Sequence, residues 1–157
     1  FRISAATPDW TAATSTGTTA AKAIDKHFSN TMAQGYCSTT EDEENPFLNV
    51  SFGGDLEVKS LMVCGRNDGD FDCRSQKLTV KAMRNGAVVK TFNDIAGSTA
   101  GHTRCAIVNV DETLDRFTGT IIDGVIISRD FSGGDCEGKT ANQLQICELR
   151  AFYKETA

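Results

Sequence analysis

The sequence predicts an all-β fold in which antiparallel strands form a sandwich or a barrel. The chain has 157 residues, enough for a single domain spanning 1–157, and its 39% hydrophobic and 24% charged residues are ordinary for a globular protein. Short apolar-rich runs recur through the middle and C-terminal half, and two of them meet at Asn85-Gly86. This residue pair favours a two-residue hairpin turn, because both central positions need a positive φ.

The N-terminal part differs from the rest. Thr11–Thr19 is rich in Thr, Ser and Ala, and we expect a loop there. The apolar spacing of Ala20–Phe28 predicts a short helix.

The strands are expected to begin with Leu56–Cys64. A hairpin over Lys77–Phe92 follows, turning at Asn85-Gly86. Further strands are predicted at Arg104–Val110, Arg116–Ile122, Gly124–Ser128 and Gln143–Tyr153. Short strands at this spacing are typical of sandwiches and barrels.

Charge and hydropathy exclude two classes of partner. The net charge of -5 is opposite to what binding a nucleic-acid backbone requires. No apolar run approaches the 18 or so residues of a transmembrane helix, and the chain begins at Phe1 without a leader, so we expect a mature or trimmed chain.

The six cysteines indicate an oxidising compartment. They form no Cys-x-x-Cys pair and no cluster with histidine, which disfavours zinc and redox motifs. We therefore expect three disulfides and a secreted, extracellular protein. Asn49-Val50-Ser51 is a sequon that makes Asn49 a candidate glycosylation site.

Several motifs suggest catalysis or nucleotide binding but lack their context. Gly133–Thr140 matches the phosphate-loop pattern, yet too little chain follows for the helix and parallel strands that such a loop needs. His27 and His102 are the only histidines and adjoin no nucleophile motif. The Glu41–Glu44 run is expected to be a solvated acidic face, so we expect no enzyme.

Four stretches together resemble the F-type lectins, fucose-binding relatives of the discoidin or factor V/VIII C-terminal domains. They are AAKAIDK at Ala20–Lys26, YCSTTEDEENPFLNVSFGG at Tyr36–Gly54, GRNDGDFDCR at Gly65–Arg74 and LQICELRAFY at Leu144–Tyr153. The resemblance implies an eight-stranded antiparallel jelly-roll β-sandwich, discoidin-like and similar to galactose-binding domains.

The third stretch resembles the Arg-x-Asp-x4-Arg/Lys sugar loop of that family. The resemblance implies that Arg66 and Arg74 donate hydrogen bonds to sugar hydroxyls, that Asp68 orients an arginine and that Phe71 covers an apolar sugar face. Five residues instead of four separate the aspartate from the second arginine. The family's histidine falls at position 39, where this chain has Thr39, whose hydroxyl has a shorter reach.

The resemblance also implies a structural Ca²⁺ ion. Its carboxylate ligands map to Asp25 and Glu148, and hard oxygen ligands suit calcium. On the alternative interpretation, Glu148 pairs with a nearby Lys or Arg. Asp68, Asp70 and Asp72 alternate along the chain and are a weaker candidate for a calcium or sugar contact. Cys73 and Thr79 stand where a calcium loop has Gly and Glu.

For the disulfides the resemblance implies Cys37–Cys147. We predict Cys64–Cys73 and Cys105–Cys136 for the others, although six cysteines allow 15 pairings.

These observations favour a secreted carbohydrate-recognition module for glycans, fucosylated ones included, in which homo-oligomers would add avidity. The first alternative is a discoidin-type cell-adhesion module that binds a protein, a cell surface or lipid head groups. The second is an appendage of a glycosidase or another enzyme.

Overall fold

The structure, a computed structural model, describes residues 2–4, 10–25, 37–41, 44–66, 74–97, 105–115, 117–129 and 143–155. Its elements in chain order are β1 (Arg2–Ser4), β2 (Thr11–Thr14), the 3-10 helix η1 (Ala20–Ile24), β3 (Ser38–Thr39), β4 (Phe47–Gly65), β5 (Leu78–Arg84), β6 (Ala87–Ile95), β7 (Cys105–Asn109), β8 (Thr120–Arg129) and β9 (Gln145–Glu155). All strand pairs are antiparallel, as expected for the predicted fold class. No helix in these ranges is long and apolar enough to span a membrane.

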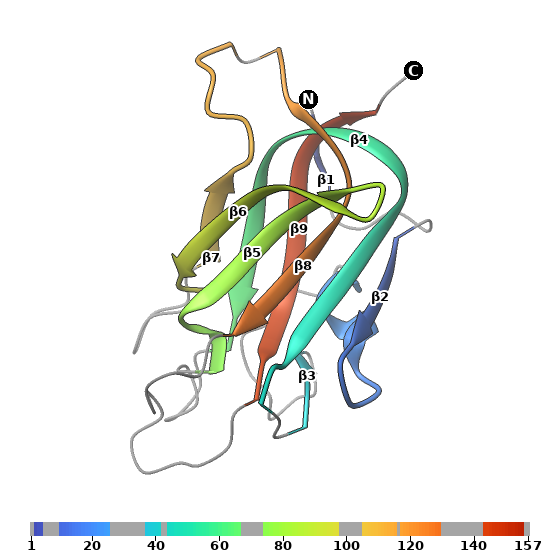
Figure 1. Cartoon of the computed structure of the whole chain (residues 1–157), viewed down its shortest axis with the longest axis vertical. Coiled ribbons are helices and arrows are strands. Elements are labelled where there is room, and N and C mark those ends of the chain that lie inside the picture. The colour runs from blue at the N-terminus through green and yellow to red at the C-terminus, as the bar shows by residue number, and fades with distance from the viewer. Residues whose placement is uncertain are drawn as a thin grey trace.

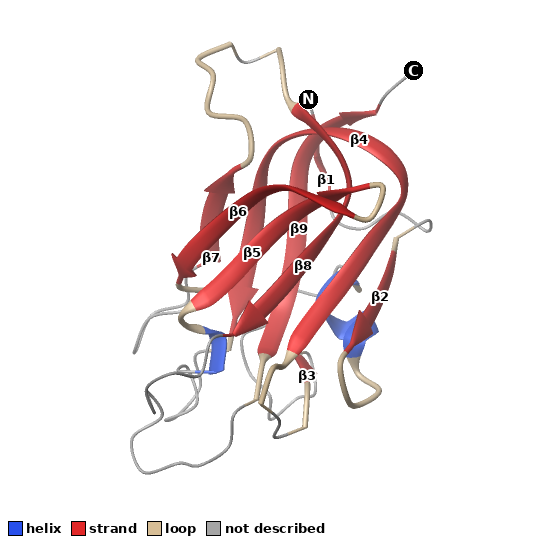
Figure 2. Ribbon diagram, viewed as in Figure 1, coloured by secondary structure: helices blue, strands red, loops and turns tan. Residues whose placement is uncertain are grey.

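Strand β4 connects the two layers of the sandwich (Figure 1). Its first part, Phe47–Ser51, pairs with β2 and β8, and its last part pairs with β9 and β7. The pairing register shifts between Ser51 and Leu56, where Gly53 has a φ of +77°. One layer is therefore β2-β4-β8-β5-β6 and the other is β1-β9-β4-β7, with β3 added to β9 (Figure 2).

The core lies between these layers and follows the period of two that strands impose. In the first part of β4, Leu48, Val50 and Phe52 are buried, whereas Phe47 and Asn49 face outward. Trp10 closes the core, with its ring centroid 4.5 Å from that of Phe52. The core residues of the other strands are Val58, Leu61, Val63, Leu78, Val80, Ala82, Val108, Ile122, Val125, Ile127, Ile146, Leu149, Ala151 and Tyr153.

The hairpin prediction is confirmed. Strands β5 and β6 meet at Asn85 and Gly86, whose φ angles are +51° and +76°, as a type I′ turn requires. The strands predicted at 104–110 and 143–153 are confirmed with shifted ends, as β7 and β9.

Three other predictions need correction. Thr11–Thr14 is a strand, not a loop, because pairing with β4 outweighs its weak apolar pattern. The predicted strand 56–64 is only the second half of β4. The strands predicted at 116–122 and 124–128 are replaced by the single strand β8, which begins at Thr120. Gly124 lies within it, where a Cβ would be 2.6 Å from the Val50 carbonyl oxygen, so the position suits glycine. The predicted helix is present as η1, over its first five residues.

The disulfides confirm one predicted pair and overturn two. Cys37–Cys147 is present, as the resemblance implied. Cys64 bonds Cys105, so Cys64–Cys73 and Cys105–Cys136 are wrong. The register explains the pairing, because Cys64 and Cys105 lie directly opposite one another on β4 and β7. Cys73 and Cys136 lie outside the described residues.

Candidate functional site

The site predicted from the third stretch lies where β4 ends, beside the start of β9 and β3, at the lower end of the molecule in Figure 1. The backbone there is held by Ser75, whose hydroxyl accepts a hydrogen bond from the Arg66 N–H at 2.7 Å and donates to the Gln145 carbonyl at 2.5 Å. Gly65 allows this approach, since a Cβ at that position would lie 2.1 Å from the Ser75 Cβ. The segment that carries Arg66 is thus tied to β9.

A chain of side-chain hydrogen bonds joins Arg66 to Thr39. The Arg66 Nη1 donates to the Gln145 Oε1 at 3.1 Å, and the Gln145 Nε2 donates to the Thr39 Oγ1 at 3.2 Å. Gln145 is only 2% exposed, and it holds the arginine and the threonine in one arrangement. The structure therefore brings two of the predicted site residues together through a third that the prediction did not include.

Thr39 is fixed on its other side by the segment before η1. Its N–H donates to the Thr19 Oγ1 at 2.8 Å, and the Thr19 hydroxyl donates back to the Thr39 carbonyl at 3.2 Å. The Thr39 hydroxyl itself donates to the Thr40 carbonyl at 3.1 Å. Its proton is thus engaged, and Thr39 faces the site as a hydrogen-bond acceptor.

Arg74, the other predicted donor, is half-buried and directly precedes Ser75 in the chain. Asp68 and Phe71 lie outside the described residues. The arrangement of Arg66, Gln145 and Thr39 suits a ligand rich in hydroxyl groups, because a planar guanidinium with one edge fixed presents its remaining N–H bonds in a set direction.

The two predicted calcium ligands also come together. Asp25 caps the C-terminal end of η1, which packs against β9, and Glu148 lies on β9 beside the Cys37–Cys147 disulfide. Glu148 is fully buried, and neither of its carboxyl oxygens has a hydrogen-bond partner among the described residues. A buried carboxylate without partners is costly, so this position needs either a proton or a cation.

The electrostatics of Glu148 agree with that conclusion. Burial raises its pKa to about 8, Arg150 opposes the rise, and the charge of Asp25 adds to it. Arg150 does not form an ion pair with Glu148 in the described part of the chain, which argues against the alternative in which an arginine neutralises the glutamate. Two neighbouring carboxyl groups, one of them an orphan, fit a hard divalent cation such as Ca²⁺. No cluster of three or more His, Cys, Asp or Glu side chains occurs in the described ranges, so the remaining ligands would be backbone or other oxygens.

Comparisons with known proteins agree on the fold. No protein-family model matches the chain, and no curated protein matches it significantly. Among solved structures, a fucose binding module of Streptococcus pneumoniae, SpX-3, has a TM-score of 0.73 at 13% identity and covers 96% of this chain and 97% of its own. The lectin domain of lectinolysin, complexed with Lewis B antigen, has a TM-score of 0.71 at 19% identity, with 94% and 93% covered.

An F-lectin, or fucolectin, from the serum of striped bass (Morone saxatilis) has a TM-score of 0.71 at 17% identity. The match covers 99% of this chain and 50% of the fucolectin chain, so the present chain spans about half of that protein. These structures confirm the discoidin-like β-sandwich that the resemblance to F-type lectins implied.

Proposed function

We propose that this protein is a carbohydrate-recognition module that binds glycans at the end of β4, and that fucosylated glycans are among its ligands. The observation that carries the proposal is the hydrogen-bonded series Arg66–Gln145–Thr39, which ties Arg66 of the sugar loop implied by the resemblance to β9 and β3. The structural neighbours, a fucose binding module, a lectin domain complexed with Lewis B antigen and a fucolectin, support the same class of ligand.

In this proposal Arg66 and Arg74 donate hydrogen bonds to adjacent sugar oxygens, and the Thr39 hydroxyl oxygen accepts one from a sugar hydroxyl. Asp68 orients an arginine and Phe71 covers the C–H face of the ring. None of these roles is catalytic, and we propose a binding module and not an enzyme. Binding at one such site is weak, so a homo-oligomer would increase the avidity.

A glycan array probed with Arg66→Ala beside the native protein tests this function. We expect the native protein to bind a related set of sugars and Arg66→Ala to lose that binding at an unchanged melting temperature. Arg84→Ala is a matched control. Arg84 is an exposed arginine on β5, in the layer that does not contain β9, and it pairs with Asp55. Equal binding by native protein and Arg66→Ala would remove Arg66 from the site.

We further propose that Asp25 and Glu148 hold a structural Ca²⁺ ion that joins η1 to β9. The orphaned carboxyl group of Glu148 supports this site. The ion would neutralise the buried charge and contribute no chemistry to ligand binding. The test is calcium binding by calorimetry to the native protein and to Glu148→Gln, which should bind at least tenfold more weakly.

Secretion is part of the proposal and is supported by the two described disulfides, which persist in oxidising compartments. Asn49 is exposed on the outer face of β4, so its side chain would be accessible to a glycan after folding. Mass spectrometry of the protein secreted from a eukaryotic host tests whether Asn49 is modified.

A second candidate function, an adhesion module, is favoured by the segment between β7 and β8. Leu114 is fully exposed and Phe117 is 67% exposed there. Figure 2 shows the segment between β7 and β8 at the top of the molecule. The Lys59 ammonium donates to the carbonyls of Thr113 and Asp115 at 2.8 Å each, so the segment is held in place. Binding to cells that survives Arg66→Ala but is lost in Leu114→Ser would favour this function over glycan recognition.

A further inference from the structure

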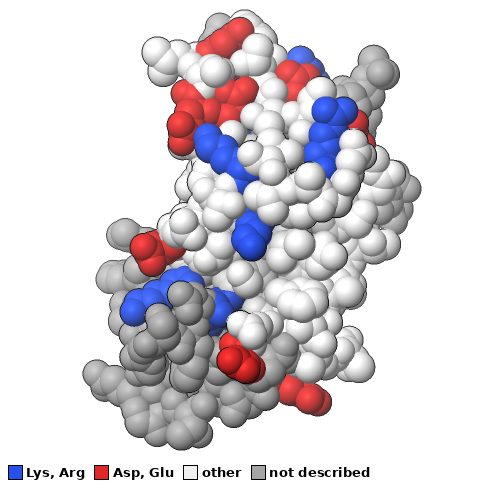
Figure 3. Space-filling view, in the orientation of Figure 1, with Lys and Arg blue, Asp and Glu red and all other residues white. Residues whose placement is uncertain are grey.

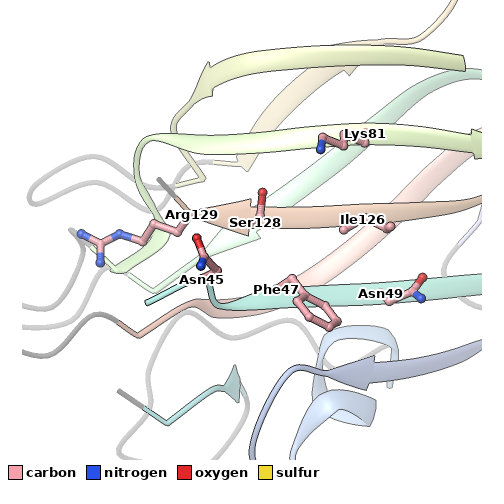
Figure 4. A pocket seen from close by; sticks show the side chains of 7 residues that line it. All are labelled: Asn45, Phe47, Asn49, Lys81, Ile126, Ser128 and Arg129. Carbon is pink, nitrogen blue, oxygen red and sulfur yellow. The ribbon is translucent and has the colours of Figure 1, made fainter. Parts of the chain in front are cut away.

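The outer face of the β2-β4-β8-β5-β6 layer carries a hollow of about 480 Å³ that the proposed glycan site does not use. Its lining is Asn45, Phe47, Asn49, Lys81, Ile126, Ser128 and Arg129, and it is shown in Figure 4. The volume falls within the range of small-molecule sites. It lies on the sheet face, whereas Arg66 lies at the end of the strands.

Strand register places the lining residues in ordered rows across the sheet. Asn49 pairs with Ile126, and Ile126 pairs with Lys81, so these three side chains form one row across β4, β8 and β5. Phe47 and Ser128 form the neighbouring row. With strands about 4.8 Å apart, the amide of Asn49 and the stem of Lys81 are separated by roughly 10 Å, with Ile126 as the floor between them.

Lys81 is the cation of this hollow. It is half-buried, and no carboxylate in the described part of the chain lies within salt-bridge distance of it, whereas Lys59, Lys90 and Lys154 each have one. Arg129 does not share its role, because its side chain is 3% exposed and its guanidinium extends away from Lys81 at the end of β8 (Figure 4).

The surroundings leave the charge of Lys81 uncompensated. No acidic residue lines the hollow. In the adjoining hollow, Asp55 is paired with Arg84 at 2.9 Å and Asp123 accepts the Asn85 N–H at 2.8 Å. Figure 3 shows the acidic side chains of this face toward its two ends and at its left edge, with a basic side chain near its middle. An anionic group is therefore favoured at Lys81, although the chain as a whole is acidic.

The remaining lining residues suit a sugar ring. The Phe47 side chain is 40% exposed and with Ile126 forms an apolar surface. The amides of Asn45 and Asn49 and the hydroxyl of Ser128 are not hydrogen-bonded to other described side chains, so they are available to the hydroxyl groups of a ligand. An apolar platform, several neutral polar groups and one lysine match a carboxylated sugar better than a hydrophobic or a polyanionic ligand.

We propose that this hollow is a second saccharide site, which binds a uronate residue with its carboxylate on Lys81 and its C–H face on Phe47. The site is independent of the proposed glycan site at Arg66. It recognises the acid group of the sugar. Both sites can hold a ligand at the same time.

The proposal is tested by calorimetric titration with two uronate trisaccharides, one of galacturonate and one of glucuronate. The protein is made in a host that leaves Asn49 unmodified. We expect the acid form to bind and its methyl ester to bind at least fivefold more weakly. Lys81→Gln and Phe47→Ala should each weaken binding of the acid about tenfold. Both positions are on the surface, so these variants are expected to keep the melting temperature.

Two matched controls isolate the hollow. Lys22→Gln removes the same charge from an exposed position on η1, and Phe117→Ala removes an exposed phenylalanine elsewhere; neither should change the affinity. Arg66→Ala should also bind the uronates normally, even if it abolishes glycan binding at the other site. The proposal is overturned if neither trisaccharide binds, if Lys22→Gln weakens binding as much as Lys81→Gln, or if Arg66→Ala is the variant that loses binding.

Discussion

Without the proposed calcium ion, the stability of this protein should fall as the pH rises from about 5 to about 8. The pKa of Glu148 is about 8 in the folded protein and has an ordinary value of 4.5. Between these values the folded carboxyl group holds a proton that the unfolded chain has released. Since a folded state that binds more protons loses stability with rising pH, the free energy of unfolding decreases across this window.

The magnitude follows from the width of the window. Each pH unit between the two pKa values costs about 1.36 kcal/mol, so the metal-free protein should lose about 4 kcal/mol between pH 5 and pH 8. This is a large part of the 5–15 kcal/mol that stabilises a typical domain. The proposed calcium ion would reverse the trend, because it would bind the ionised carboxylate and stabilise the folded state most where the proton is absent.

The assay is urea unfolding at pH 5 and pH 8, in chelator and in excess Ca²⁺, for the native protein and for Glu148→Gln. The glutamine variant cannot titrate, so it should show a smaller loss in chelator and little response to calcium. Histidines also titrate in this window, and the difference between the two proteins cancels their contribution. Identical pH profiles for the two metal-free proteins, or equal stabilisation of both by calcium, would refute the reasoning.

Of three further predictions, two rest on single contacts and one rests on the lining of the hollow. Gln145→Ala should weaken glycan binding about tenfold, because Arg66 loses the hydrogen bond that holds it. An unchanged affinity on the array would mean that Gln145 does not contribute to the site. Gly65→Ala should lower the free energy of unfolding by about 3 kcal/mol in urea, because its Cβ would clash with Ser75, whereas a shift under 0.5 kcal/mol would mean that this contact relaxes. A glycan on Asn49 should block uronate binding in the hollow, and Ser51→Ala, which removes the sequon, should restore it in the same host; binding by the glycosylated form would contradict this arrangement.

The fold could be predicted from the sequence where the signal was local. Asn85-Gly86 specifies its own turn, and the alternating burial of β5 was readable from its residues. Strand β2 was missed because Thr11–Thr14 has little apolar periodicity of its own. It forms a strand because it pairs with β4. The disulfide between Cys64 and Cys105 likewise depends on the register of β4 against β7, which residue spacing does not reveal.

The candidate site was predicted in part for a similar reason. The resemblance named Thr39 and Arg66, but Gln145 lies outside the motif that carries the sugar loop. Its only signal was its place as the second residue of the closing stretch Leu144–Tyr153, two residues before Cys147. A polar residue at the start of a buried strand is a reason to expect a buried hydrogen bond there.

The long separation between Thr39 and Gln145, 106 residues, has a consequence for how the protein is made. Synthesis proceeds from the N-terminal end, and β9 supplies Gln145, Cys147 and Glu148, so neither the proposed glycan site nor the proposed calcium site can form until that strand leaves the ribosome. Until then β4 has an unpaired edge along its second half, and Cys37 has no partner. We expect nascent chains of this protein to depend on chaperones and disulfide isomerases to protect that edge and thiol until the last strand completes the sheet.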